Sequence, residues 1–195
     1  ILQVIALNTI RIDYTNGIPV FLIEPQTTNL VVNSNIINSY TSSSGITITD
    51  NNIIGIDGQL SAALATISAI GNFLFKDISC TASTVYTFSF YVKRGTMTDM
   101  KYRFRDISNS VDILSPTSYF SQTSVSGFSR VKFTLTTPAG CSILRVYLLS
   151  DSGVLGNVYF TDSQLVLGSL PGSYIPTLAT AVTRNADLAT VNPPA

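Results

Sequence analysis

Apolar and polar residues alternate with a period of two along most of the chain. In segment 86–93, YTFSFYVK, the residues Tyr, Phe, Phe and Val alternate with Thr, Ser, Tyr and Lys. Segments 100–105 and 130–136 repeat the same pattern. Successive side chains of a strand point to opposite faces of a sheet. The period therefore predicts antiparallel strands with one face on a core and one toward solvent.

Three further segments depart from this simple alternation. Segments 143–149 and 158–167 are apolar at most positions of both faces, which predicts strands in the centre of a sheet. Segment 59–69, QLSAALATISA, fits either a helix or a strand. It carries Ser and Thr and lacks charge, so we expect a strand there.

Turn signals separate these segments. Asn16-Gly17 stands between RIDYT and IPVFLIE, which predicts a hairpin, and glycine-containing turns recur along the rest of the chain. Eight or more short strands with frequent turns predict an all-β fold, an antiparallel β-sandwich or barrel.

The two ends of the chain differ from its middle. Residues 1–29 are expected to form a hairpin and a lead-in, and residues 30–168 the sandwich. Residues 169–195 contain four prolines and no long alternation, so they are expected to form an extended strap or linker to a further domain. The chain begins with Ile rather than Met, and we expect it to be a piece of something longer.

Composition narrows the function. The 195 residues include eleven Lys and Arg and eleven Asp and Glu, so the net charge is zero, which argues against a binder of nucleic-acid phosphates. No apolar run reaches the roughly 18 to 20 residues of a membrane span. There is no His, no Trp and a single Glu, Glu24. Because His is the commonest general base, we expect a protein without enzymatic activity.

Cys80 and Cys141 are the only cysteines. A bridge between them would close a long loop, worth roughly 4 kcal/mol on the entropic account of disulfides. The alternative, which we favour from the sequence, is two small buried thiols.

Two stretches carry a recognisable pattern. They are GIPVFLIEPQTTNLVVNSNIINSY at 17–40 and VYFTDSQLVLGSLPGSYIPTLATAVTRNAD at 158–187, with YTFSFYVKRG and SGFSRVKFTLTT between them. This order resembles a jelly-roll domain family of bacteriophage tail, fibre and other virion structural proteins. The resemblance implies a jelly-roll sandwich similar to carbohydrate-binding modules. Phe128 stands where that family usually has Trp, and Val166 where it usually has Glu, which weakens sugar stacking or a polar role there.

The residues that carry the pattern also have physical interpretations as structural supports. Thr28 and Asn29 can hold backbone groups by side-chain hydrogen bonds. Pro176 favours an extended Ile175, so that Tyr174 can anchor the strap. Arg184 and Asp187 can pair with each other or with a neighbouring subunit. The full set of motif residues is Glu24, Thr28, Asn29, Gln164, Tyr174, Pro176, Arg184 and Asp187.

A cationic row suggests a glycan-binding face. Lys101, Arg103 and Arg105 alternate along one strand and therefore share a face. We expect the same face to carry further residues: Tyr91, Lys93, Arg145 and Tyr147. Charge-assisted hydrogen bonds and ring contacts from such a face would hold an acidic or hydroxyl-rich glycan. The alternative is an ordinary solvated face, or Lys and Arg that discourage edge pairing.

The resemblance also suggests a structural calcium ion. Asp162 holds the position of a ligating aspartate in the closing strand of carbohydrate-binding jelly rolls, with Asp57 as the second candidate. Other oxygens would come from Asp13, Asp50, Asn51 and Asn52. Calcium needs six to eight oxygens, and no compact Asp-rich loop supplies them. No other cofactor is expected.

The leading hypothesis is a non-enzymatic structural domain of a bacteriophage virion appendage: a tail fibre, tailspike or head fibre. It would serve as spacer or adaptor, contact other virion proteins and copies of itself, and possess a surface for host polysaccharide. A trimer is expected by analogy only. The alternative is a carbohydrate-binding module that targets an attached polysaccharide-degrading enzyme, and a third, distant one is the enzyme itself.

Overall fold

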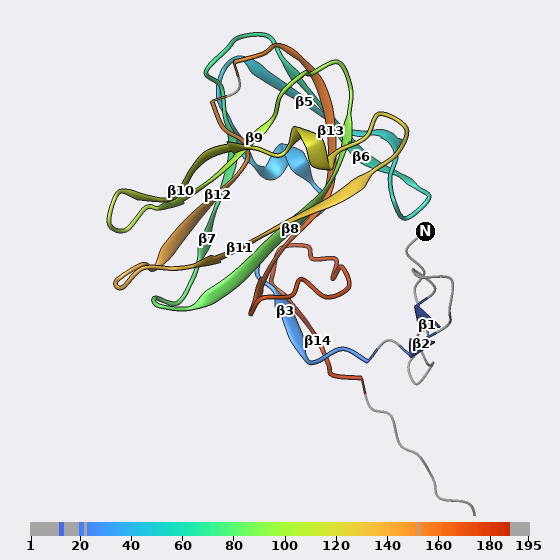
Figure 1. Cartoon of the computed structure of the whole chain (residues 1–195). Coiled ribbons are helices and arrows are strands. Elements are labelled where there is room, and N and C mark those ends of the chain that lie inside the picture. Colours follow the sequence, from blue (N-terminus) through green and yellow to red (C-terminus); the bar gives the residue numbers. More distant parts are fainter. Residues whose placement is uncertain (1–11, 14–19, 22, 152, 188–195) are drawn as a thin grey trace, which may run out of the picture.

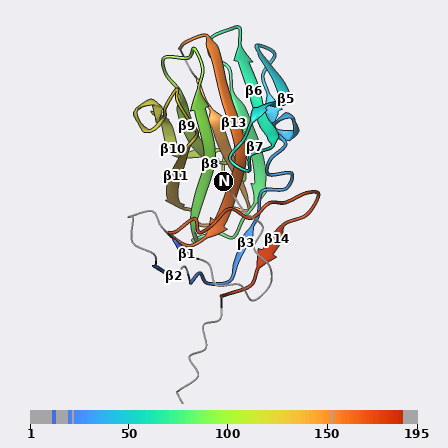
Figure 2. The same ribbon diagram turned by 90° about the vertical axis from the view of Figure 1, so that its right-hand side faces the viewer.

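The computed structural model describes residues 12–13, 20–21, 23–151 and 153–187. Two five-stranded sheets pack face to face (Figures 1 and 2). Along the first sheet the strands are β10 (Val111–Ser118), β9 (Lys101–Asp106), β12 (Ile143–Leu149), β7 (Leu74–Ser79) and β4 (Thr41–Ser42). Along the second they are β11 (Ser129–Thr136), β8 (Val85–Arg94), β13 (Gly156–Leu167), β6 (Leu60–Ile67) and β5 (Ile46–Ile54).

Every strand pairing among the described residues is antiparallel, and the predicted all-β sandwich is confirmed as a jelly roll. The predicted central segments form β12 and β13, each third of five in its sheet. The ambiguous segment 59–69 forms strand β6. Two single-turn 3₁₀ helices, η1 (Ile37–Ser39) and η2 (Phe120–Gln122), lie in connections. Within the described part of the chain, no helix is long and apolar enough to cross a membrane.

The core consists largely of aromatic rings from facing strands. Phe90 of β8 is fully buried and contacts Tyr119, Phe133 and Phe160 at centroid distances of 5.6 to 6.3 Å. Phe88, two residues earlier, meets Phe104 of the opposite sheet edge-on at 5.9 Å. Edge-to-face pairs of this kind add roughly 0.5–1.5 kcal/mol to the burial of the rings. The alternating pattern therefore places the predicted apolar face inside.

Residues 27–29 and 182–184 meet at one pole of the sandwich, here named the base. β3 (Thr27–Asn29) pairs with β14 (Val182–Arg184) in a separate two-stranded antiparallel sheet (Figures 1 and 2). The lead-in and the strap thus lie side by side. β1 (Ile12–Asp13) pairs with β2 (Val20–Phe21), as a hairpin requires, and its predicted Asn16-Gly17 turn lies outside the described residues. The domain boundaries stay a prediction.

A bulge in β13 makes room for the lead-in. β13 pairs with β8 through Thr161 and again from Gln164, and the residues between them interrupt the register. Asp162, in this bulge, has φ 53°, a region that Asp tolerates better than most residues. β6 accompanies β13 only as far as Phe160. Beyond the bulge, the lead-in takes the place of β6, and the N–H of Leu30 donates to Leu165 O at 2.9 Å.

Candidate functional site

All but one of the predicted motif residues make side-chain hydrogen bonds in one region at the base, which we call the brace. It joins the lead-in, the bulged half of β13 and the strap, and its members are Glu24, Thr28, Asn29, Gln164, Tyr174, Arg184 and Asp187. Pro176 is exposed and makes no such bond, but it separates the buried residues Ile175 and Thr177, both of which are hydrogen-bonded into the brace.

Asn29 lies at the centre of the brace. Its side chain is fully buried, and its Nδ2 donates to the carbonyl oxygens of Ser163 at 3.2 Å and Ile175 at 2.8 Å. Its Oδ1 accepts the N–H groups of Val31 at 3.0 Å and Leu165 at 3.1 Å. One amide therefore satisfies four backbone groups on three segments, where unpaired groups would be costly.

Gln164 performs the same role for the strap. Its Oε1 accepts the N–H of Ile175 at 2.7 Å, and its Nε2 donates to the carbonyl oxygens of Pro171 and Ser173. The strap has no strand partner over these residues. The Gln164 amide therefore substitutes for a neighbouring strand.

Glu24 links the lead-in to the end of the strap. Its carboxylate accepts the N–H of Ser173 at 2.5 Å and pairs with Arg184 at 2.8 Å. The backbone N–H of Glu24 donates to the Asp187 carboxylate at 2.8 Å, and the N–H of Asp187 returns a bond to Glu24 O at 2.9 Å. Gly172 has φ +59°, and any Cβ there would lie 3.0 Å from Glu24 Oε1, which explains the glycine. Arg184 and Asp187 are thus joined through Glu24.

Tyr174 closes the brace over the bulge. Its hydroxyl lies 2.5 Å from Ser34 Oγ, and burial together with the charge of the neighbouring Asp162 raises the pKa of Tyr174. Burial, together with the nearby charge of Asp57, raises the pKa of Asp162 to about 6. Asp162 is 5% exposed, and its Oδ2 has no hydrogen-bond partner among the described residues.

Arg130 of β11 adds a contact to the strap beside the brace. Its guanidinium donates to Gly172 O at 2.6 Å and to Ser89 Oγ at 3.0 Å. It also lies 5.5 Å from the ring centroid of Tyr91. Arg130 therefore fastens the strap across the outer face of the second sheet. The only available signal was its place in the SGFSRVKF stretch of the resemblance.

The first sheet carries most of the predicted cationic row on its outer face, which we call the arginine face. In the register, Arg105 lies opposite Arg145 and Arg103 opposite Tyr147, so that these residues of β9 and β12 are neighbours. Lys101, at the start of β9, continues the row and lies 3.9 Å from Asp99. The structure therefore brings these five predicted residues together.

Acidic side chains already engage the arginines of this face. The carboxylate of Asp112 in β10 forms salt bridges with Arg103 at 2.7 Å and with Arg105 at 3.2 Å. Arg145 forms two hydrogen bonds with Asp77 of β7, at 2.6 and 2.8 Å. Much of the positive charge is thus balanced within the sheet.

Aromatic rings lie beneath the guanidinium groups of the arginine face. Arg145 stacks 3.8 Å from the centroid of Phe75, and Arg103 lies 5.4 Å from that of Tyr147. These two rings are 8% and 4% exposed, whereas neighbouring Phe73 is 41% exposed. Of the three rings, Phe73 is the one that offers an accessible surface.

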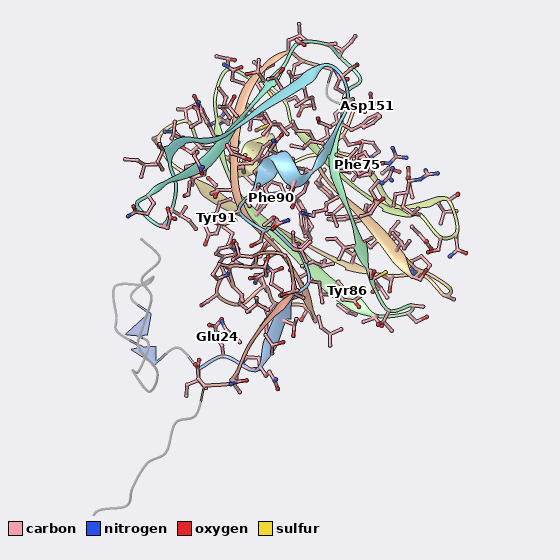
Figure 3. All side chains as sticks on the ribbon, turned by 180° about the vertical axis from the view of Figure 1, so that it is seen from behind. Glu24, Phe75, Tyr86, Phe90, Tyr91 and Asp151 are labelled. Carbon is pink, nitrogen blue, oxygen red and sulfur yellow. The ribbon has the colours of Figure 1, made fainter. Side chains whose placement is uncertain are left out.

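The prediction that Tyr91 and Lys93 share this face is wrong. Both lie on β8, in the second sheet, and Tyr91 and Phe75 are on different sheets (Figure 3). Alternation assigns a residue to one side of its own strand, but β8 and β9 are consecutive strands of opposite sheets. Periodicity alone does not reveal that crossover.

Several of the predicted calcium ligands are engaged in local hydrogen bonds or exposed on β5. An Asp57 oxygen accepts Gln59 N–H at 3.0 Å and Ser61 Oγ at 2.8 Å, and Asp50 accepts two N–H groups that begin η1. Asn51 and Asn52 are exposed on β5, and the side chain of Asp13 lies outside the described residues. No group of three His, Cys, Asp or Glu side chains suited to a metal exists in the described part of the chain. Asp57 and Asp162 are near enough that the charge of Asp57 helps to raise the pKa of Asp162, and Asp162 Oδ2 has no hydrogen-bond partner among the described residues. A calcium ion held by this pair stays a prediction.

A groove of about 500 Å³ lies at the base beside β3. No acidic or basic side chain lines it, and its lining residues are Pro25, Gln26, Thr27, Thr28, Leu30, Tyr86 and Leu167. The hydroxyl oxygen of Tyr86 accepts a hydrogen bond from the N–H of Thr81 at 3.0 Å. The groove offers no acid–base pair for chemistry.

No protein-family model matches the chain, and no curated protein matches it in sequence. Among solved structures, it is similar to the enzymatically active domain of tailspike protein 4 of bacteriophage CBA120, with TM-score 0.55 and 18% identity over 72% of this chain. The match spans 21% of that tailspike chain, about a fifth of its length. A xylan-binding domain from Paenibacillus barcinonensis has TM-score 0.49 and 13% identity, covering 76% of this chain and 96% of its own. The likeness to the tailspike domain shows a shared jelly-roll fold.

Proposed function

We propose that this chain is a non-enzymatic adaptor domain of a bacteriophage virion appendage: a tail fibre, tailspike or head fibre. The observation that carries the proposal is the brace. The residues whose pattern resembles the virion family meet around Asn29, Gln164 and Glu24, where they join the described parts of the lead-in and the strap to one sandwich. The residues of this pattern thus fix the lead-in and the strap to the sandwich, as a building block of an appendage requires.

The direction of the chain favours an adaptor over an in-line spacer. β3 and β14 are antiparallel neighbours, so the described chain reaches the sandwich and leaves it at the same pole. In an in-line spacer, the chain enters the domain at one pole and leaves it at the opposite pole. Here the described chain enters and leaves at the same pole, so the sandwich would project to the side of the chain's path. Exposed apolar side chains near the base, Ile23, Leu167 and Leu178, support contacts with other virion proteins or with copies of the chain, for which a trimer is the expected stoichiometry.

Support for a non-enzymatic role comes from the available chemistry. The sequence has no His, and the groove at the base has no charged lining. The carboxylates of Asp77 and Asp112 on the arginine face are held by arginines. The groove and these two carboxylates therefore supply no free general acid and base facing each other across a cleft.

Immunogold labelling tests the proposal. An antibody raised against the recombinant chain would be applied to gradient-purified particles of the phage whose genome encodes it. We expect gold on an appendage and peptides of the chain in the mass spectrum of the particles. Presence only in the soluble lysate would contradict a virion role. Release of oligosaccharide from host polysaccharide by the isolated chain would contradict the non-enzymatic part.

A carbohydrate-binding module is the second candidate, favoured by the arginine face with its exposed Phe73. The test compares binding of host-envelope polysaccharide by the wild type and by a triple variant with Lys101, Arg103 and Arg105 replaced by Ser. The matched control is Lys132→Ser, which removes an exposed cation from β11 of the second sheet. A loss of at least about tenfold in the triple variant alone would support this candidate. Equal binding by all three proteins would reject it.

A further inference from the structure

Two thiols meet at the base end of the first sheet. Cys80 follows β7, and Cys141 lies in the loop that leads into β12, the strand paired with β7. The two Sγ atoms are 3.5 Å apart, and both cysteines are free in this structure. The N–H of Cys80 donates to Ser142 O at 3.0 Å, which keeps the two segments in register. Two cysteines 61 positions apart in sequence are thus in van der Waals contact.

The two thiols differ in access. Cys141 is 1% exposed, whereas Cys80 is partly exposed. We therefore expect a reagent in solution to reach Cys80 first, with the sulfur of Cys141 3.5 Å from that of Cys80. A disulfide needs an S–S distance of about 2.05 Å, so the sulfurs must approach by roughly 1.5 Å. The loop before β12 contains Gly140 at φ +77° and bears Cys141 near its end, outside the strand ladder.

We propose that Cys80 and Cys141 are a site of oxidative cross-linking by low-molecular-weight disulfides, which locks β7 to the loop before β12. The thiolate of Cys80 attacks the small disulfide, forming a mixed disulfide and releasing one small thiolate. The thiolate of Cys141 then attacks the Cys80 sulfur, closes the protein disulfide and releases the second small thiolate. The two protons lost by the cysteines are taken by the two released thiolates. One small disulfide is reduced and one protein disulfide is formed.

The local environment sets the pH dependence of this exchange. Burial raises the pKa of Cys80, and burial together with the neighbouring Cys80 and Asp106 raises that of Cys141 to about 12. Both groups are therefore thiols at neutral pH, and only the thiolate attacks a disulfide. The charge of Asp106, whose carboxylate accepts two hydrogen bonds from Asn109, raises the pKa of both thiols further. The cross-link is expected to form slowly at pH 7 and faster toward pH 9.

The experiment uses the full chain, purified reduced and incubated with oxidised glutathione. We expect intact-mass and peptide mapping to show loss of two hydrogen atoms, a Cys80–Cys141 peptide pair and no uptake of alkylating reagent. The oxidised protein should melt about 5–15 °C higher than the reduced one, and dithiothreitol should reverse the shift. Persistent glutathione on Cys80, dimers linked between chains, or two thiols still reactive after prolonged oxidation would each overturn the proposal.

Single variants separate the two steps. Cys141→Ala should accumulate glutathione on Cys80, because the resolving thiol is missing. Cys80→Ala should react little while folded, because Cys141 is buried. Equal glutathione uptake by the two variants would contradict the assigned order. If either variant fails to fold, peptide mapping of the wild type during oxidation, with early mixed disulfide at Cys80 or at Cys141, decides the order.

Discussion

Replacing Asn29 with Ala tests whether the brace stabilises the fold. The fully buried amide donates to the carbonyl oxygens of Ser163 and Ile175 and accepts the N–H groups of Val31 and Leu165. Alanine at this position leaves two N–H groups in the interior without these acceptors. The alanine side chain is also too small to fill the space that the amide occupied.

The expected cost follows from these two N–H groups. Each buried donor left unsatisfied costs about 1–3 kcal/mol, so the variant should lose about 2–6 kcal/mol of unfolding free energy. For a chain of this length the loss corresponds to a fall of about 5–15 °C in Tm. Urea unfolding followed by circular dichroism measures the free energy, and an unchanged m value would show that the compared states are the same.

Thr28→Ala is the matched control for this experiment. Thr28 is the adjacent residue, and its hydroxyl bonds that of Thr183 at 2.7 Å on the exposed side of the β3–β14 sheet. Water can replace that partner, so we expect a loss of less than about 0.5 kcal/mol. Equal losses in the two variants, or a loss below about 1 kcal/mol for Asn29→Ala, would refute the reasoning.

Three further changes probe other parts of the fold. Burial raises the pKa of Asp162 to about 6, so the native state binds the acid proton more tightly than the unfolded state does. The free energy of unfolding should therefore fall by up to about 3 kcal/mol as the pH rises from about 4 to 6. Asp162→Asn should abolish that slope in urea titrations at several pH values, and a slope that persists would reject the assignment. Arg130→Met removes the two hydrogen bonds that Arg130 donates, so it should cost about 1–3 kcal/mol of unfolding free energy. It should also speed proteolysis of the strap near Gly172, and an unchanged cleavage rate would contradict this. Phe90→Ala should cost about 3–5 kcal/mol in the same unfolding assay, since a fully buried ring surrounded by other rings is removed, and a cost below about 1 kcal/mol would argue against this core.

Local sequence pattern predicted the strands well because alternation reports burial directly. Phe88, Phe90 and Val92 of β8 are fully buried, and Phe104 of β9 likewise faces the core. The apolar character of 143–149 and 158–167 placed both strands correctly in sheet centres, since a central strand is covered on more sides than an edge strand.

The candidate site was predicted in part. The cationic row of β9 does meet Arg145 and Tyr147, but only because β12 happens to be its neighbour in the sheet. Asp77 and Asp112, which balance the arginines, come from β7 and β10 and gave no signal of their own. The role of Arg130 was also invisible, because its partner Gly172 is far along the chain.

The amino-acid sequence by itself determined which side chains of each strand are buried, where turns occur, and that the chain is all β. These properties depend on neighbours along the chain, whose spacing is fixed by strand geometry. The tertiary structure alone decided which strands share a sheet, that Tyr91 and Lys93 lie apart from the arginine face, and that the two thiols touch. Those outcomes depend on crossovers and on contacts between distant segments, which no local periodicity encodes.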